Sequence, residues 1–218
     1  VIGKKHNLLR EIKKNNIKWI FIATPNNTHY TIVKTCLQKG INVFCEKPLC
    51  LSPSKAKYLI TLAQKKKLKL YISDLYNFYS DKIKRLSSSN KVYRSKLVSE
   101  KDTEFFNRFM YHDISIFYKF LKNDRLKSSN FNMDKLNKIY KILIKLRKNK
   151  SIEFTYNLNS KKKNHIINNI HIRSKKDFLK KMIYNVMYNK VDIEKNNIKA
   201  LFIIKFLHAI KKKVKYVH

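Results

Sequence analysis

Glycine is almost absent from this chain of 218 residues, which has two Gly, three Pro, three Cys and one Trp. Because the glycines are Gly3 and Gly40, neither a GxGxxG nor a GxxxxGK phosphate-binding loop occurs in the sequence. The cysteines, Cys36, Cys45 and Cys50, are odd in number and lack CxxC spacing. They favour reduced thiols over a disulfide framework or a zinc site.

Long apolar runs are also missing. The longest are a few residues, far below the roughly 18 residues of a transmembrane segment, and the opening VIGKKHNLLREIKK contains no signal-peptide core. We therefore expect a soluble, cytoplasmic protein without a membrane partner. With 44% hydrophobic residues, 13 Phe and 13 Tyr, the chain has enough apolar surface for a packed core. Its length allows one or two domains.

Acidic residues are scarce: 50 Lys and Arg against 14 Asp and Glu give a formal net charge of +36. Such a charge is typical of proteins that bind nucleic acid. However, the basic residues are spread evenly, and Lys outnumbers Arg 43 to 7, whereas base recognition favours bidentate Arg contacts. Lys, Asn and Ile have A/T-rich codons, so genome composition explains the excess at least as well. We expect no specific nucleic-acid partner and keep a basic nucleic-acid-binding protein as an alternative.

The first third of the chain alternates between strand and helix patterns. Residues 18–23, 41–45 and 68–73 are short apolar runs typical of strands buried on both faces. Apolar positions at helical spacing lie between them, ending at Gly40 and restarting at Ser52-Pro53. Strands joined by helices predict right-handed crossovers and an α/β fold with a doubly wound parallel sheet. Residues 7–16 are expected to form a preceding helix.

Two turns after these strands carry a resemblance to a known family. Thr24-Pro25-Asn26, with His29 just after it, follows the first strand, and Glu46-Lys47-Pro48 follows the second. In this order, with Gly40 between them, they resemble the N-terminal domain of the glucose-fructose oxidoreductase / inositol dehydrogenase / MocA (Gfo/Idh/MocA) family of NAD(P)-dependent oxidoreductases. Ligands of such sheets bind beyond the carboxyl ends of the strands, where both turns lie.

Residues 109–115, FMYHDIS, resemble the second signature of that family, in which a histidine, here His112, opens a helix at the substrate pocket. Where the family usually has an Asp one helical turn earlier, this chain has Arg108. The family also begins with a strand and a Gly-rich turn of roughly 30 residues, which holds the cofactor pyrophosphate. This sequence starts in the helix before the Trp19 strand, so we expect an N-terminally truncated member, with a degenerated member as the alternative.

The resemblance implies NAD or NADP as cofactor, and hydride transfer between the nicotinamide and a hydroxyl or carbonyl of a sugar, cyclitol or nucleotide-sugar. A partly desolvated lysine has a lowered pKa and can hydrogen-bond the substrate oxygen, and histidine titrates near neutrality. The implied catalytic residues are Lys47 and His112, and the implied cofactor-binding residues are Thr24, Pro25, Asn26, His29, Glu46 and Lys47.

Each of these residues also has a simpler explanation. Lys47 is one of 43 lysines, and His112 shares helical spacing with Phe109 and Ile116, as a structural histidine would. The turn residues could form ordinary turns. A non-catalytic remnant or binding protein of the same fold, without the cofactor cradle, is therefore the main alternative function.

The domain organisation follows the resemblance. Residues 1–76 are expected to form a partial dinucleotide-binding (Rossmann) domain, and residues 77–218 a small α+β substrate and oligomerisation domain with an antiparallel sheet. Alternation over 142–147 and 152–157 predicts a hairpin, although 140–147 fits a helix equally well, and 165–172 could add a third strand. A last helix, about 192–212, could pack back on the first domain. We expect a homo-oligomer, a sugar-like substrate and no metal site.

Overall fold

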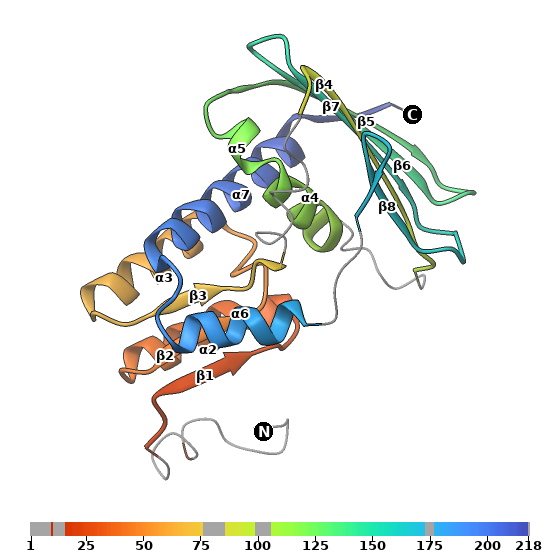
Figure 1. Cartoon of the computed structure of the whole chain (residues 1–218). Coiled ribbons are helices and arrows are strands. Elements are labelled where there is room, and N and C mark those ends of the chain that lie inside the picture. The colour runs from red at the N-terminus through yellow and green to blue at the C-terminus, as the bar shows by residue number, and fades with distance from the viewer. Residues whose placement is uncertain (1–9, 11–15, 76–85, 99–105, 173–176, 218) are drawn as a thin grey trace.

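The computed structural model describes residues 10, 16–75, 86–98, 106–172 and 177–217. Two β-sheets lie at opposite ends of the molecule, with helices between and around them (Figure 1). The helix expected over residues 7–16 lies outside the described residues, except for residues 10 and 16.

The first sheet consists of β1 (Trp19–Ile22), β2 (Asn42–Cys45) and β3 (Leu70–Ile72), parallel and in that order. The connecting helices are α2 (Asn26–Gln38) and α3 (Pro53–Lys65). This is the parallel α/β arrangement that the sequence predicts. In register, Ile22 lies opposite Cys45, so β1 and β2 end side by side and the turns after them share one edge of the sheet.

Local sequence signals set the ends of both helices. Gly40 has a φ of +77°, the left-handed conformation that favours glycine after a helix. Ser52 begins α3, with its Oγ accepting from the Lys55 backbone N–H at 3.4 Å, and Pro53 is the first helical residue. These signals keep the connections short.

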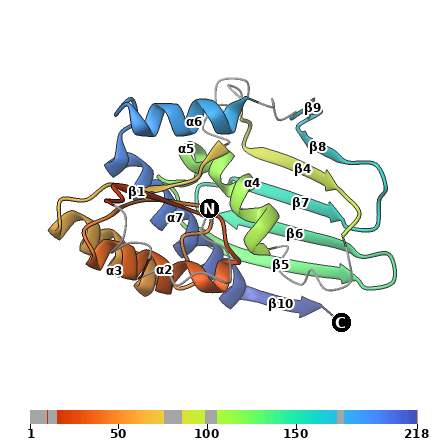
Figure 2. The ribbon, with the colours of Figure 1, turned by 90° about the horizontal axis from the view of Figure 1, so that it is seen from below.

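Helices cover both faces of this sheet. Figure 2 shows α6 (Phe178–Met187) on one side of the strands and α2 and α3 on the other. Met182 and Val186 of α6 pack on Phe44 and Tyr71. The long helix α7 (Ile193–Lys213) contacts β3 and α3.

At the β3 edge, the side chain of Asn196 in α7 pairs with the backbone of Ile72. Its Oδ1 accepts from the Ile72 N–H at 2.9 Å, and its Nδ2 donates to the Ile72 carbonyl at 2.9 Å. Asn196 is buried. One side chain therefore joins the last helix to the edge of the first sheet.

The second sheet has the order β10-β5-β6-β7-β4-β8-β9. The predicted hairpin is confirmed as β6 (Ile139–Leu146) and β7 (Ser151–Asn157), so residues 140–146 are strand and not helix. The sheet is mixed, because β7 pairs in parallel with β4 (Ser89–Ser95), and β5 (Leu126–Asp134) pairs in parallel with β10 (Val214–Val217).

Residues 165–172 contribute two short strands in place of the one expected. They are β8 (Asn164–Ile167) and β9 (Ile170–His171), joined by Asn168 and Asn169 with φ of 45° and 67°. Asparagine tolerates this left-handed conformation, which a tight hairpin requires. β8 pairs with β4 and not with the strand that precedes it in sequence.

Three short helical segments fill the space between the sheets: a π-helical turn η2 (Phe106–Met110), α4 (Tyr111–Ile116) and α5 (Tyr118–Leu121). The inner face of the second sheet packs against them through buried residues such as Phe154, whose ring meets that of Phe117 at 6.4 Å. In the part of the chain that the structure describes, no helix is long and apolar enough to cross a membrane.

Candidate active site

The turn after β1 is polar and open to solvent. Thr24 and Pro25 are exposed, and Asn26, at the start of α2, is partly exposed. The Thr24 and Thr28 hydroxyl oxygens lie 2.7 Å apart, and the Thr28 hydroxyl donates to the Pro25 carbonyl at 2.8 Å. Three of the six residues expected to bind cofactor, Thr24, Pro25 and Asn26, thus form one ordered, accessible turn.

His29 lies beneath this turn. It is 0% exposed, with Nδ1 2.8 Å from the Pro48 carbonyl oxygen and Nε2 2.9 Å from the Thr24 carbonyl oxygen. Whichever nitrogen carries the proton, the ring connects the turn after β1 to the turn after β2. Its place is therefore between the two turns and not on their open surface.

Lys47 follows β2, and its peptide bond to Pro48 is cis. Its Nζ donates to the backbone carbonyl of Arg108 at 2.8 Å, which joins the first sheet to η2. The pKa of Lys47 is lowered to about 8, chiefly by burial; the neighbouring Glu46 opposes this shift, and the charges of Arg94 and Arg108 add to it. A lysine with this pKa can release or take up its proton near neutral pH.

His112 is the second residue of α4 and is partly buried. Burial lowers its pKa well below the ordinary value, and the Lys47 ammonium is the next cause, followed by Arg94 and His165. The ring is therefore neutral at pH 7 and able to accept a proton. The structure thus brings together the two residues for which the sequence predicts catalytic roles.

A buried carboxylate, missed by the sequence analysis, lies directly beside them. Asp113 is 0% exposed and accepts from Arg94 Nη2 at 2.8 Å, His165 Nε2 at 2.9 Å and the Tyr156 hydroxyl at 2.9 Å. Burial alone would raise the pKa of Asp113, but the Arg94 guanidinium and the hydrogen bonds from His165 and Tyr156 outweigh it and lower the pKa. Asp113 is therefore ionised.

This group, which we call the Asp113 network, consists of Asp113, Arg94, His165 and Tyr156. Burial lowers the pKa of His165, so its ring is neutral and donates from Nε2. The partners come from β4, β7 and β8 of the second sheet. One signal in the sequence could have indicated the role of Asp113: acidic residues are scarce in this chain, and this one stands next to His112 in an apolar helix.

Arg108, the residue in the place of the expected Asp, is exposed. Its guanidinium lies 5.9 Å from the centre of the Phe109 ring, and that of Arg94 lies 5.5 Å from the same ring. Both arginines lower the pKa of Lys47 and of His112. In place of an orienting carboxylate, the site therefore has a further cation, in addition to Lys47 and Arg94.

Other reactive groups do not contribute to this site. All three cysteines are buried, and burial raises the pKa of Cys36 and of Cys50 to about 11 and that of Cys45 well above the ordinary value, which keeps the thiols protonated. Among the described residues, no group of three or more His, Cys, Asp or Glu could hold a metal ion.

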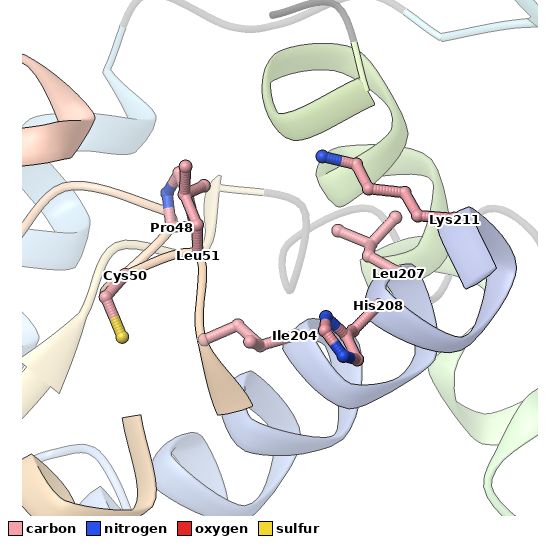
Figure 3. A pocket seen from close by; sticks show the side chains of 7 residues that line it. All are labelled: Pro48, Cys50, Leu51, Ile204, Leu207, His208 and Lys211. Carbon is pink, nitrogen blue, oxygen red and sulfur yellow. The ribbon is translucent and has the colours of Figure 1, made fainter. Parts of the chain in front are cut away.

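A cavity of about 20 Å³ lies between α7 and the loop after Pro48. Figure 3 shows side chains that line it, among them Cys50, Leu51 and His208. This volume is comparable to the space that one water molecule needs. The cavity is too small for a substrate or a cofactor.

Comparison with known proteins agrees with this fold. Residues 4–73 match the sequence model of the oxidoreductase family with an NAD-binding Rossmann fold, GFO_IDH_MocA. An uncharacterized oxidoreductase of Bacillus subtilis, YfiI, is 43% identical over 54 residues, which are 25% of this chain and 14% of that protein. The chain therefore covers much less than two thirds of this relative.

Solved structures extend the likeness to nearly the whole chain. UDP-N-acetylglucosamine 3-dehydrogenase GnnA from Acidithiobacillus ferrooxidans superposes with a TM-score of 0.73 and 15% identity over 90% of this chain and 78% of that one. KijD10, a 3-ketoreductase from Actinomadura kijaniata in complex with NADP and TDP-benzene, gives 0.74 and 10% over 97% and 82%. Both show a shared fold. By the match over residues 4–73, this part of the chain is similar in sequence to the Gfo/Idh/MocA family of oxidoreductases.

Proposed function

We propose that this chain acts in an NAD(P)-dependent oxidoreductase that transfers hydride between a nicotinamide and a hydroxyl or carbonyl of a sugar, cyclitol or nucleotide-sugar. The observation that carries the proposal is the pairing of Lys47, with a pKa of about 8, and a neutral His112 next to the carboxyl ends of β1 and β2. The substrate class is supported by the two structural neighbours, a nucleotide-sugar dehydrogenase and a 3-ketoreductase.

The turns after β1 and β2 fit the nicotinamide end of the cofactor. They are adjacent, polar and accessible at Thr24, Pro25 and Glu46, and His29 holds them in fixed relation. Parallel α/β sheets bind their ligands at this edge. Thr24, Pro25, Asn26 and Glu46 would hold the nicotinamide ribose and ring, and bound NAD or NADP supplies the hydride acceptor or donor.

Lys47 and His112 would divide the proton chemistry. When an alcohol is oxidised, the neutral His112 ring accepts the hydroxyl proton while the Lys47 ammonium stabilises the charge that develops on the oxygen. When a carbonyl is reduced, the same steps run in reverse: the His112 ring returns the proton to the oxygen while the Lys47 ammonium stabilises its negative charge. The Asp113 network holds Arg94 beside both residues, where its charge favours the neutral form of His112 and helps to bring the pKa of Lys47 toward neutral pH.

Replacement of the lysine tests this proposal. Lys47→Met should lower kcat by roughly 10²–10⁴-fold, as expected for loss of a positioned acid-base group, with little change in the dinucleotide Kd. The control is Lys57→Met on the exposed side of α3. In the wild type, carbonyl reduction should slow as the pH rises through about 8, because Lys47 loses its proton there.

The measurement is steady-state absorbance of the reduced nicotinamide with a panel of sugars, polyols and nucleotide-sugars. If turnover by Lys47→Met stays within about threefold of wild type, Lys47 has no part in the mechanism. Arg108, in place of the carboxylate usual in the family, favours the second candidate, a non-catalytic binding protein. Sugar binding without any turnover in the wild type would support that candidate.

A further inference from the structure

A second, larger cavity lies away from Lys47 and His112. It has a volume of about 500 Å³ and is enclosed by α4, α5 and α7 beside β3, elements that lie next to one another in Figure 1. Ligand sites commonly have volumes of roughly 300–1,000 Å³. None of its lining residues belongs to the Asp113 network or to the residues predicted to bind cofactor.

One part of the cavity wall is apolar. Ile116 at the end of α4 and Tyr71 on β3 are buried there, and Ile198 on α7 is 54% exposed. Tyr118 adds an aromatic ring that packs edge-on against Phe202 at 5.2 Å, which keeps it in place. The wall can therefore contact the apolar body of a ligand.

Four lysines also line the cavity, and the two on α7 have carboxylate partners. Lys199 Nζ lies 2.6 Å from Asp74, which also accepts from the Ser115 hydroxyl at 2.7 Å. Lys195 Nζ lies 3.0 Å from Asp192. Their positive charge is thus largely compensated.

The other two lysines, Lys119 and Lys122, lie on α5 and just after it, three positions apart and thus on one side of the helix. Both are exposed, and no carboxylate among the described residues lies within ion-pair distance of either. Positive charge therefore remains at one side of the cavity, next to an apolar wall.

We propose that this cavity binds a small amphipathic organic anion, with its apolar body against Ile116 and Ile198 and its acidic group at Lys119 and Lys122. The overall charge of +36 would attract anions to the whole surface. Only a site with both an apolar wall and paired lysines selects an anion that also has an apolar body. The proposal is independent of the oxidoreductase chemistry.

Fluorescence titration with two probes tests the proposal: anilinonaphthalene sulfonate, an amphipathic anion, and uncharged N-phenylnaphthylamine, which lacks the sulfonate. The double variant Lys119→Glu/Lys122→Glu should raise the Kd of the anionic probe at least about tenfold, since reversal of two charges replaces attraction with repulsion. Binding of the uncharged probe should hardly change. Ile198→Ser should weaken the binding of both probes, because it removes part of the apolar wall.

The matched control is Lys161→Glu/Lys163→Glu, an exposed pair between β7 and β8 that changes the net charge by the same amount. Its affinity for the anionic probe should stay within about twofold of wild type. Equal weakening by the two double variants, or probe binding that does not saturate, would overturn the proposal. Circular dichroism establishes that each variant is folded, and Lys119→Gln/Lys122→Gln replaces the reversal if it is not.

Discussion

Strand β3 of the first sheet and strand β7 of the second bury their residues differently. In the first sheet, Leu70, Tyr71 and Ile72 of β3 are all buried, because helices lie on both faces. In the second sheet, β7 buries only every other residue, with Ile152, Phe154 and Tyr156 at 0% exposure and their neighbours partly exposed. A strand with one solvated face can carry polar residues on that face. The inner face of the second sheet also carries polar side chains, Arg94 and His165, which reach the candidate site.

This difference also separates two ways of stabilising the site. Lys47 is placed by the turn after β2, whose geometry depends on short connections and on His29. Arg94 and His165 are placed by strands brought together from distant parts of the chain. The site therefore depends on local structure on one side and on long-range pairing on the other.

The largest effect is expected from breaking the Asp113 network, the part of the site that depends on long-range strand pairing. Asp113→Ala leaves Arg94 buried without its carboxylate and should lower the free energy of unfolding by about 3–5 kcal/mol. Denaturant titration measures this, and hydrogen exchange should show lost protection in β7 and β8 while β2 retains it. The control is Asp134→Ala at the exposed end of β5. A variant within about 0.5 kcal/mol of wild type would show that the network contributes little.

A smaller effect is expected from pH. Burial lowers the pKa of His112 and of His165 below about 6.5, the value of the unfolded chain. At a pH between the folded and unfolded pKa values, the unfolded chain binds more protons than the folded protein. Each histidine therefore lowers the free energy of unfolding as the pH falls below about 6.5, by at most about 1.4 kcal/mol per pH unit. Asp113 has a lowered pKa, so its contribution persists above about 3.9 and is lost only in stronger acid.

Urea midpoints at about pH 7 and about pH 5.5 measure this dependence. His165→Gln should reduce the difference between the two midpoints, whereas His208→Gln, exposed on α7, should leave it unchanged. If the exposed variant has the larger influence, the two buried histidines are not neutral in the folded protein.

The smallest effect is expected at Gly40, which tests the local signals that shape the first sheet. A Cβ at Gly40 would meet no atom within 4 Å, so the cost of Gly40→Ala comes only from its φ of +77° and should be about 1–2 kcal/mol. Gly40→Asn should cost less, because asparagine tolerates this conformation. Thermal unfolding compares the two, and an alanine variant as stable as wild type would contradict the explanation.

The sequence predicts the first sheet well because its signals are local. Apolar runs, Gly40 and Ser52-Pro53 each act within a few residues, and β1, β2 and β3 form where they indicate. In the second sheet, the hairpin of β6 and β7 has a local turn and is predicted, whereas β4, β5 and β10 are not. β4 is SNKVYRS, and its partners β7 and β8 are supplied by distant parts of the chain.

The same distinction applies to the candidate site. The resemblance indicates Lys47, His112 and the turn residues, since these stand in recognisable motifs. Arg94 and Tyr156 stand in no motif, and their role depends on a sheet whose strand order no local pattern contains. The place of His29 between two turns likewise depends on a contact across 19 residues.

The Asn196 amide has a consequence for solubility. A strand at the edge of a sheet offers unpaired N–H and carbonyl groups on which a strand of another molecule can add, and proteins commonly block such edges. At Ile72 both groups are already occupied by one side chain, and α7 lies along the same edge. A single asparagine thus takes the place of a neighbouring strand and protects this edge against intermolecular β-pairing.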